Sequence, residues 1–369
     1  HELGHTLGLS HPGKYNGQGF NYERSAEYAQ DTKARSVMSY WAETHQPGHK
    51  FAGRSPAAPM MDDVAAAQRL YGANTKTRNT DTIYGFNSNA GREVYSLKQG
   101  SDKPIFTVWD GGGNDTLDFS GFTQNQTINL KAEAFSDVGG LRGNVSIAKG
   151  VIVENAIGGA GNDTLTGNEG NNRLTGGKGA DKLHGGAGAD SFVYHRIGDS
   201  TPQNPDVIQD FQSGLDKIDL TGVLQEAGIK SLNFVDKFGT KVGDAVLGHD
   251  SKTGRSTLAV DTTGNGTADL MIASQSQIKQ TDVIWNGEAP TVTPTPGPTV
   301  VPMSEPVPSP VPSPISEPTD SKPDPKPDPD PQPEPRPSPG PAPRPGRRFI
   351  QKVFSSFKGF VNKVRSIFR

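Results

Sequence analysis

The sequence has 369 residues, a formal net charge of −3 and no cysteine, which excludes disulfide bonds and every metal or nucleophile site that needs a thiol. Only 32% of the residues are hydrophobic, whereas glycine and proline number 45 and 30, so we expect a turn-rich fold followed by an extended segment. The chain contains no apolar run of about eighteen residues or more, and we therefore predict no membrane-spanning helix.

The chain opens with HELGHTLGLSH, a pattern that brings histidines together. His1 and His5 lie four residues apart on one face of a predicted helix, so both imidazoles can reach one metal ion. Glu2 lies beside them and can accept a proton from a water activated by the metal. Gly8 can adopt a positive φ, which would end the helix and turn the chain so that His11 becomes a third ligand.

These eleven residues match the zinc-protease signature H-E-x-x-H-x-x-G-x-x-H in full. The signature requires a methionine-containing turn downstream, and Met38 in SVMSYW provides one. The alternative is a coincidental helix with surface histidines. Agreement at Gly8, His11 and Met38 together favours the metal site.

Residues 1–73 and 74–289 are predicted to be two domains that differ in secondary structure. The first is expected to be the α+β C-terminal part of a zinc metalloprotease catalytic domain, with helices over 1–9 and 61–70. From residue 80, short β-branched and aromatic runs alternate with Gly, Asn and Asp, which is typical of an all-β domain. Strands are expected at 105–109, 127–130, 145–147 and 151–153, with further strands over 194–285 and a helix around 275–280.

Four consecutive nine-residue units occupy 158–193: GGAGNDTLT, GNEGNNRLT, GGKGADKLH and GGAGADSFV. The pattern G-G-x-G-x-D-x-U-x is typical of a parallel β-roll that binds Ca²⁺ between stacked turns. Two units should make one coil, so the first should stack on the third and the second on the fourth. The apolar residue of each unit should point into the core: Leu165, Leu174, Leu183 and Phe192. A single Gly-Asp turn would be explained more simply as a hairpin, but four contiguous units favour calcium.

The spacing predicts calcium ligands from carboxylates, amides and main-chain carbonyls. The first site would pair Gly159, Gly161 and Asp163 with Gly176, Lys178 and Asp181. The second would pair Asn168, Gly170 and Asn172 with Gly185, Ala187 and Asp190. A third would use Gly177, Gly179 and Asp181 with Tyr194, Arg196 and Asp199, and a fourth would use Gly186, Gly188 and Asp190 with Asp206. Because Asn172 stands where an aspartate is expected, the second site should bind calcium more weakly.

HELGHTLGLSHPGKYN, SVMSYW, APMMDDVAAAQRLYGAN and TIYGFNSN together resemble the serralysins, metzincin proteases secreted by Gram-negative bacteria, over residues 1 to about 285. The resemblance implies a zinc endopeptidase followed by a calcium β-roll. Its zinc ligands would be His1, His5 and His11, with Glu2 as the general base. Tyr40 would be a displaceable further ligand that stabilises the oxyanion; without the resemblance, Tyr40 would be interpreted as an aromatic residue packed beside Trp41.

The resemblance also implies calcium ligands outside the strict repeat. These are Asp110, Gly112, Gly113 and Asp115 in DGGGND, the facing Arg78, Thr80 and Thr82, and the pair Ile152 and Glu154. It implies a secreted, monomeric protein with protein substrates, no nucleic-acid partner and type I-like export without a cleaved N-terminal signal. Because the chain begins at the first zinc ligand, without the preceding helix and strands of the family, we expect this fragment alone to have little or no proteolytic activity.

Two further segments leave alternatives open. Asp261–Asp269 resembles an EF-hand loop but has Ile272 where a glutamate is needed, so a plain turn is favoured. Residues 290–346 hold most of the prolines and are expected to form a polyproline II spacer. Residues 347–369 place apolar side chains on one face of a basic helix, which would bind an anionic membrane surface, dock on a partner or remain disordered.

Two rival functions therefore remain beside the zinc endopeptidase. One is a non-catalytic calcium β-roll module for adhesion or surface attachment, and the other is a membrane-perturbing peptide delivered by the tail. The intact set of Glu2, His11 and Tyr40 favours the endopeptidase.

Overall fold

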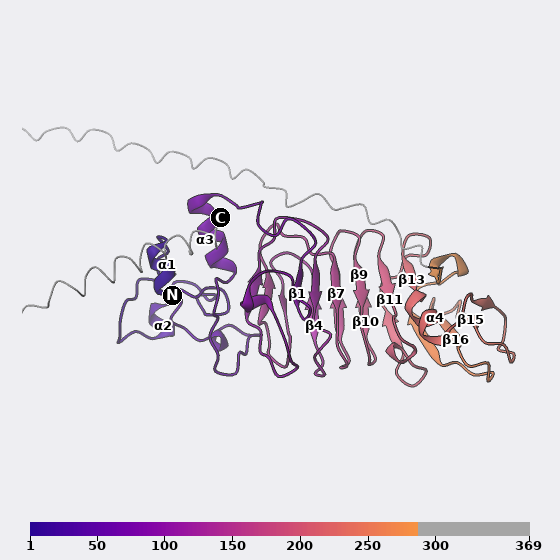
Figure 1. The fold of residues 1–369 in the computed structure, drawn as a ribbon. Coiled ribbons are helices and arrows are strands. Elements are labelled where there is room, and N and C mark those ends of the chain that lie inside the picture. Colours follow the sequence, from indigo (N-terminus) through magenta and orange to yellow (C-terminus); the bar gives the residue numbers. More distant parts are fainter. Residues whose placement is uncertain (287–369) are drawn as a thin grey trace, which may run out of the picture. The chain divides into compact units, whose positions relative to one another are not determined.

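The computed structural model describes residues 1–286, which are mainly β-structure with a few short helices (Figure 1). The spacer predicted over 290–346 and the helix predicted over 347–369 lie outside the described residues. In the part that is described, no helix combines the length and the apolar character needed to cross a membrane.

The N-terminal region contains the helices α1 (Glu2–Thr6), α2 (Tyr22–Ser25) and α3 (Met61–Tyr71) and the 3-10 turn η1 (Glu43–His45). The α3 helix confirms the prediction over 61–70. The α1 helix is shorter than predicted, because the chain reverses at Gly8, where φ is +83° and the next N–H, that of Leu9, donates back to the carbonyl of Gly4. This reversal brings the residues after the helix back toward it.

Two sheets of short, mostly parallel strands form the roll. One sheet has the order β1 (Ile83–Gly85), β3 (Thr116–Asp118), β7 (Asn155–Ile157), β9 (Arg173–Thr175), β11 (Ser191–Val193), β13 (Lys217–Asp219) and β18 (Val283–Ile284). The other has the order β14 (Asn233–Phe234), β15 (Asp244–His249), β16 (Ser256–Asp261), β17 (Leu270–Ser274), β12 (Asp206–Ile208), β10 (Lys182–His184), β8 (Thr164–Thr166) and β4 (Thr127–Asn129). Only β15, β16 and β17 pair antiparallel within these sheets.

A smaller third sheet consists of β2 (Phe106–Val108), β6 (Val145–Ile147) and β5 (Phe135–Ser136). The remaining short elements are the helix α4 (Thr221–Ala227) and the 3-10 turns η2 (Glu93–Tyr95), η3 (Ile197–Asp199) and η4 (Gln280–Asp282).

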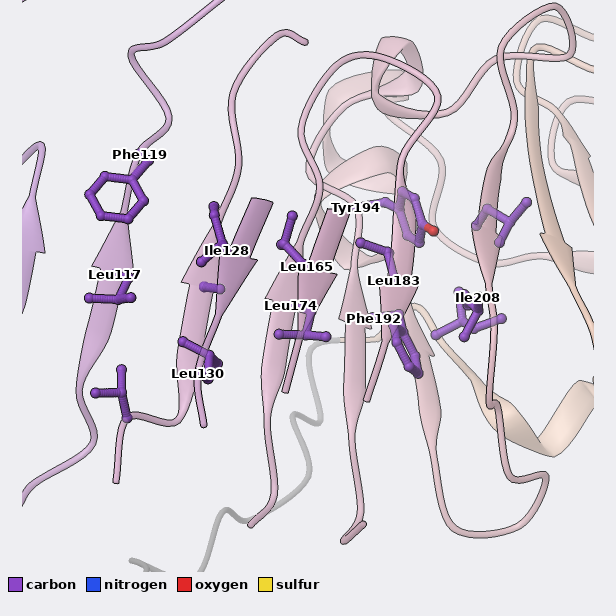
Figure 2. Close-up of a cluster of buried hydrophobic side chains, with 14 of the residues drawn as sticks. Leu117, Phe119, Ile128, Leu130, Leu165, Leu174, Leu183, Phe192, Tyr194 and Ile208 are labelled. Carbon is purple, nitrogen blue, oxygen red and sulfur yellow. The ribbon is translucent and has the colours of Figure 1, made fainter. Parts of the chain in front are cut away.

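The predicted stacking of the nine-residue units is confirmed. Strand β8 pairs with β10, which places Leu165 opposite Leu183, and β9 pairs with β11, which places Leu174 opposite Phe192. These side chains are fully buried between the two sheets, and Figure 2 shows them stacked along the inside of the roll. Successive units therefore contribute their apolar side chains to one continuous core, alternately from one sheet and from the other.

Two secondary-structure predictions were wrong. Residues 151–153 form no strand; Val151 and Val153 are buried in an irregular segment before β7, so their β-branched composition reflects burial and not sheet pairing. The helix expected around 275–280 is also absent, since only the 3-10 turn η4 begins at the end of this segment. The helix of this region is instead α4, which buries Val223 and Leu224 against the core.

The predicted catalytic-domain segment packs against the region of the third sheet through a second apolar cluster. Ala34, Phe51 and Met60 from the first 73 residues contact Ile105 and Leu141. The main chain adds hydrogen bonds between Lys50 and Arg142. The region of the third sheet therefore supports the segment that carries the histidines.

Candidate metal centres

The three predicted zinc histidines converge on one point. Nε2 of His11 lies 3.1 Å from Nε2 of His1 and 3.1 Å from Nε2 of His5. Three nitrogens bound to one tetrahedral zinc ion at about 2.05 Å would lie about 3.3 Å apart. The spacing therefore fits a zinc ion, and among the described residues this triad is the group of three histidine or acid side chains whose ligand atoms all lie within 4.8 Å of one another.

Main-chain carbonyls orient all three imidazoles. Nδ1 of His1 faces the Val37 carbonyl at 2.8 Å, Nδ1 of His5 faces the Leu9 carbonyl at 2.9 Å, and Nδ1 of His11 faces the Tyr15 carbonyl at 2.6 Å. Since a carbonyl can only accept, each Nδ1 must carry the hydrogen. The Nε2 lone pairs then point at one another, an arrangement that a cation stabilises.

Met38 lies beneath the histidine helix. It is buried, and a Cβ at residue 4 would collide with its sulfur, which explains the glycine between Glu2 and His5. The hydroxyl of Ser36 accepts from the Met38 N–H at 2.9 Å and donates to the buried Asp63 at 2.7 Å. Met38 therefore packs beneath the histidine helix and is not a proposed zinc ligand.

Glu2 and Tyr40 line the same cleft of about 530 Å³ as the histidines. The Tyr40 ring lies 4.5 Å from the His11 ring and 5.5 Å from the His1 ring, measured between centroids. Its hydroxyl accepts a long hydrogen bond of 3.4 Å from the Gly17 N–H. Both predicted catalytic side chains thus lie beside the candidate zinc position.

The sequence interpretation missed two buried supports of this site. Tyr15 stacks on His11 with centroids 5.3 Å apart and an interplanar angle of 11°, and its hydroxyl donates to Asp31 at 2.8 Å. Asp63 accepts from the N–H groups of Val37 and Met60, both at 2.8 Å. The sequence carries a signal for Asp63, because an acid three residues after a helix-capping position is a capping pattern, but no sequence signal marks Tyr15 and Asp31.

The turns of the roll carry two columns of buried acids and amides, one before each sheet. In the first column, the N–H of Gln126 donates to Asp163, that of Asp163 to Asp181, and that of Asp181 to Asp206, at 2.7, 2.7 and 2.8 Å. In the second column, the main-chain N–H of Asn172 donates to the carboxylate of Asp190 at 2.8 Å, and the main-chain N–H of Asp190 donates to the carboxylate of Asp216 at 3.0 Å. Each turn therefore holds one oxygen of the carboxylate from the next turn.

Several acids of the roll have a second carboxylate oxygen without a hydrogen-bond partner. These oxygens show whether the residues suit a calcium ion. Oδ2 is buried without a hydrogen bond in Asp115, Asp181, Asp190 and Asp206. Burial, with the charge of Asp163 adding, raises the pKa of Asp181 to about 8, and burial, with the charge of Asp181 adding, raises the pKa of Asp206 to about 9. Unpaired buried carboxylates are costly, and hard cations with oxygen ligands relieve that cost. The residues therefore fit calcium.

The structure brings together the first two predicted calcium sets. In the first, the Lys178 N–H reaches the Gly159 carbonyl at 2.9 Å, and in the second the Ala187 N–H reaches the Asn168 carbonyl at 3.2 Å. For the third set, burial and, less strongly, the charge of Asp199 raise the pKa values of Asp181 and Asp206. Tyr194 and Arg196 lie between β11 and η3, and the remaining glycines lie in the turns between the strands of the repeat: Gly161, Gly170, Gly176, Gly177, Gly179 and Gly185.

The fourth predicted set is wrong in one member. Strand β12 pairs with β10, so Asp206 lies beside Asp181 and not beside Asp190. The turn with Gly186, Gly188 and Asp190 instead faces Asp210, which accepts from the N–H groups of Gly185 and Gly186 at 2.9 and 2.8 Å, and Asp216. The nine-residue period ends before these acids, but Asp206-Val-Ile and Asp216-Lys-Ile keep the D-x-U part of the repeat, and that signal could have placed both.

The predicted outer sets also face each other. The N–H of Thr82 donates to Asp115 at 2.8 Å, and that of Asp115 donates to Glu154 at 2.8 Å. A Cβ at Gly113 would collide with the main chain of Thr80, and Arg78 has a positive φ of 48° in the same loop. Asp110 accepts from the Gly112 N–H at 2.7 Å, and Ile152 lies in the turn that ends at Glu154.

The EF-hand-like segment is a self-contained turn. The carboxylate of Asp261 accepts from the N–H groups of Thr263, Gly264 and Gly266 at 3.0, 2.6 and 2.7 Å, and that of Asp269 accepts from Thr262 at 2.8 Å. These hydrogen bonds satisfy the carboxylates and agree with the turn interpretation.

Comparison with known proteins adds an independent finding. Residues 73–285 match the family model described as Peptidase M10 serralysin C terminal. The chain is 55% identical over 298 residues to the metalloprotease AprA of Pseudomonas entomophila (strain L48), covering 77% of this chain and 61% of that protein. It is 51% identical over 291 residues to serralysin C of Dickeya chrysanthemi, covering 76% and 60%. The chain thus spans about three fifths of the length of these relatives.

Proposed function

Because this chain belongs to the serralysin family of metalloproteases, we propose that it provides the zinc-binding part and the calcium β-roll of a secreted zinc endopeptidase. The observation that supports the proposal most directly is the convergence of His1, His5 and His11, with Nε2 atoms 3.1 Å apart, in a cleft that Glu2 and Tyr40 also line.

In this proposal, the three histidines hold the zinc ion, Glu2 transfers protons and Tyr40 stabilises negative charge. A zinc ion supplies Lewis-acid activation of water and of the scissile carbonyl. Glu2 accepts a proton during attack and returns it to the leaving amine. The Tyr40 hydroxyl, which accepts the long 3.4 Å hydrogen bond from Gly17, moves to donate a hydrogen bond to the developing oxyanion.

Calcium has a structural role in the proposed protein. The unpartnered oxygens of Asp115, Asp181, Asp190 and Asp206 lie in turns of the roll, remote in sequence from the zinc ligands. Because the chain has no cysteine, it cannot form disulfide bonds. Bound calcium would stabilise the secreted fold in their place. The protein is proposed to act as a monomer on protein substrates.

The 369-residue chain alone is proposed to have little or no activity. No residue that lines the described cleft belongs to a strand. Proteases commonly align an extended substrate along a strand edge, so peptide binding would need a segment beyond the described residues. A longer protein that includes such a segment is the appropriate enzyme for the test.

The test measures zinc content and casein hydrolysis in that longer protein. We expect one zinc ion per chain and, for Glu2→Ala, retained zinc with hydrolysis reduced about 10²- to 10⁴-fold because a general base is lost. Glu23→Ala, an exposed acid on α2, is the matched control and should leave hydrolysis unchanged. Absence of stoichiometric zinc, or full activity of Glu2→Ala, contradicts the proposed enzyme.

A further inference from the structure

Asn16 and Gly17 lie in an open loop beside the histidine cleft. The Asn16 side chain is exposed and forms part of the cleft lining. Gly17 and Gly19 have φ values of +88° and +89°, and a Cβ built at either position would meet no heavy atom within 4 Å. The loop therefore has room to change its backbone angles without disturbing neighbouring segments.

The main-chain N–H of Gly17 is held weakly. It donates a hydrogen bond of 3.4 Å to the hydroxyl of Tyr40, which is beyond the usual range for such bonds. Among the residues that the structure describes, the side-chain amide of Asn16 has no hydrogen-bond partner. The Gly17 nitrogen and the side-chain carbonyl carbon of Asn16 can therefore approach each other without breaking a strong contact.

A second Asn-Gly pair, Asn265 and Gly266, has the same chemistry but is firmly held. The Gly266 N–H donates to the carboxylate of Asp261 at 2.7 Å. Oδ1 of Asn265 accepts from the N–H and the hydroxyl of Thr267 at 2.8 and 2.6 Å. The hydrogen bond to a carboxylate opposes loss of the Gly266 proton, and the two bonds from Thr267 fix the asparagine side chain. Asn265 is exposed like Asn16, so the two pairs differ in their hydrogen bonds and not in their access to water.

We propose that Asn16 is a site of spontaneous deamidation at the edge of the histidine cleft. The nitrogen of Gly17, after losing its proton to base, bonds to Cγ of Asn16; the bond from Cγ to Nδ2 breaks, and Nδ2 leaves as ammonia. Water then opens the resulting succinimide ring. Cleavage of the bond between Cγ and the Gly17 nitrogen gives aspartate, and cleavage of the bond between the main-chain carbonyl carbon of residue 16 and that nitrogen gives isoaspartate.

The reaction changes the cleft in two ways. The succinimide has no N–H at residue 17, so the Tyr40 hydroxyl loses this donor. Both final products carry a carboxylate at residue 16, which adds a negative charge to a cleft that Glu2 and His11 also line. The chemistry needs only water and base, so it is independent of the proposed proteolytic activity.

Peptide mapping by mass spectrometry tests the proposal on the 369-residue chain, stored with calcium in mildly alkaline buffer. Deamidation adds about 1 Da to a peptide. The peptide that contains Asn16 should gain this mass roughly tenfold faster than the peptide that contains Asn265, because Asn265 reacts only after local opening of its turn. In urea, where both pairs are unfolded, the two rates should agree within about threefold. The proposal is overturned by the absence of a mass gain at Asn16, or by a ratio of rates in buffer that is no larger than the ratio in urea.

Asn16→Gln is the matched control, since it keeps an exposed amide before Gly17 but has a longer side chain that must close a larger, less favourable ring. The peptide that contains residue 16 should then keep its mass, while the peptide that contains Asn265 reacts as in the parent. A mass gain in the first peptide that persists in Asn16→Gln would place the reaction at the neighbouring Gln18 and overturn the assignment to Asn16. Fragmentation of the parent peptide should locate aspartate and isoaspartate at residue 16.

Discussion

The carboxylate of Asp63 on α3 accepts a 2.8 Å hydrogen bond from the main-chain N–H of Val37. The carbonyl of the same Val37 faces Nδ1 of His1 at 2.8 Å. One buried acid therefore fixes the turn that orients the first histidine. These two contacts connect Asp63 on α3 to His1 through the main chain of Val37.

We expect Asp63→Asn to weaken both zinc binding and folding. An asparagine offers one acceptor where Asp63 meets N–H groups from Val37 and Met60 and a hydroxyl from Ser36, so one buried donor loses its partner. The free energy of unfolding should fall by about 1–3 kcal/mol. Urea unfolding and zinc competition with a chelator measure the two effects. Asp62→Asn is the control: its partly exposed pair with Arg35, at 3.3 Å, should contribute under about 1 kcal/mol. Equal effects of Asp63→Asn and Asp62→Asn would contradict the proposal that Asp63 holds the turn beside the zinc site.

Tyr40→Phe should reduce turnover without removing zinc. In the proposed enzyme the hydroxyl acts on the oxyanion, so kcat should fall about 10²-fold while KM changes little. Tyr28→Phe, in which the ring is 40% exposed, should retain kcat. Steady-state kinetics with a peptide substrate in the longer protein measure both values. A raised KM with unchanged kcat would assign Tyr40 to substrate binding instead.

The calcium-free roll should lose stability as the pH rises. Burial raises the pKa of Asp163 to about 6, of Asp190 to about 7, of Asp181 to about 8 and of Asp206 to about 9. The folded state then binds more protons than the unfolded state above about pH 4, so its stability is fully present below that pH and is lost through about pH 9. The urea midpoint in calcium-depleted buffer should be higher at pH 5 than at pH 8.5.

Saturating calcium should abolish or reverse this trend, because calcium binds the deprotonated carboxylates. The same two buffers with added calcium provide the comparison. A calcium-free protein that is equally stable at both pH values would show that these acids do not change protonation on folding.

Leu174→Ala should destabilise the calcium-loaded roll by about 2–5 kcal/mol, since it removes a fully buried side chain from the stack in Figure 2 and leaves a cavity. Leu215→Ala, at a residue 45% exposed, should change the free energy of unfolding by about 0.5 kcal/mol or less. Urea unfolding at saturating calcium measures both. Similar effects from the two leucines would contradict the assignment of the core.

The sequence by itself determined the local features that depend on spacing. The separation of His1, His5 and His11 and the freedom of Gly8 placed three imidazoles near one point, because a helix turn and a glycine turn have fixed geometry. The nine-residue period determined which units stack, because strand side chains alternate and two units close one coil.

Only the tertiary structure decided what depends on neighbours distant in the chain. The pairing of β12 with β10 assigned Asp206 to Asp181, which the strict nine-residue period, ended before residue 206, did not show. The buried irregular segment at 151–153 resembles a strand in sequence, since β-branched residues are favoured by burial as well as by sheet pairing. Whether a polar side chain meets a donor, an acceptor or an ion is set by the coil packed against it.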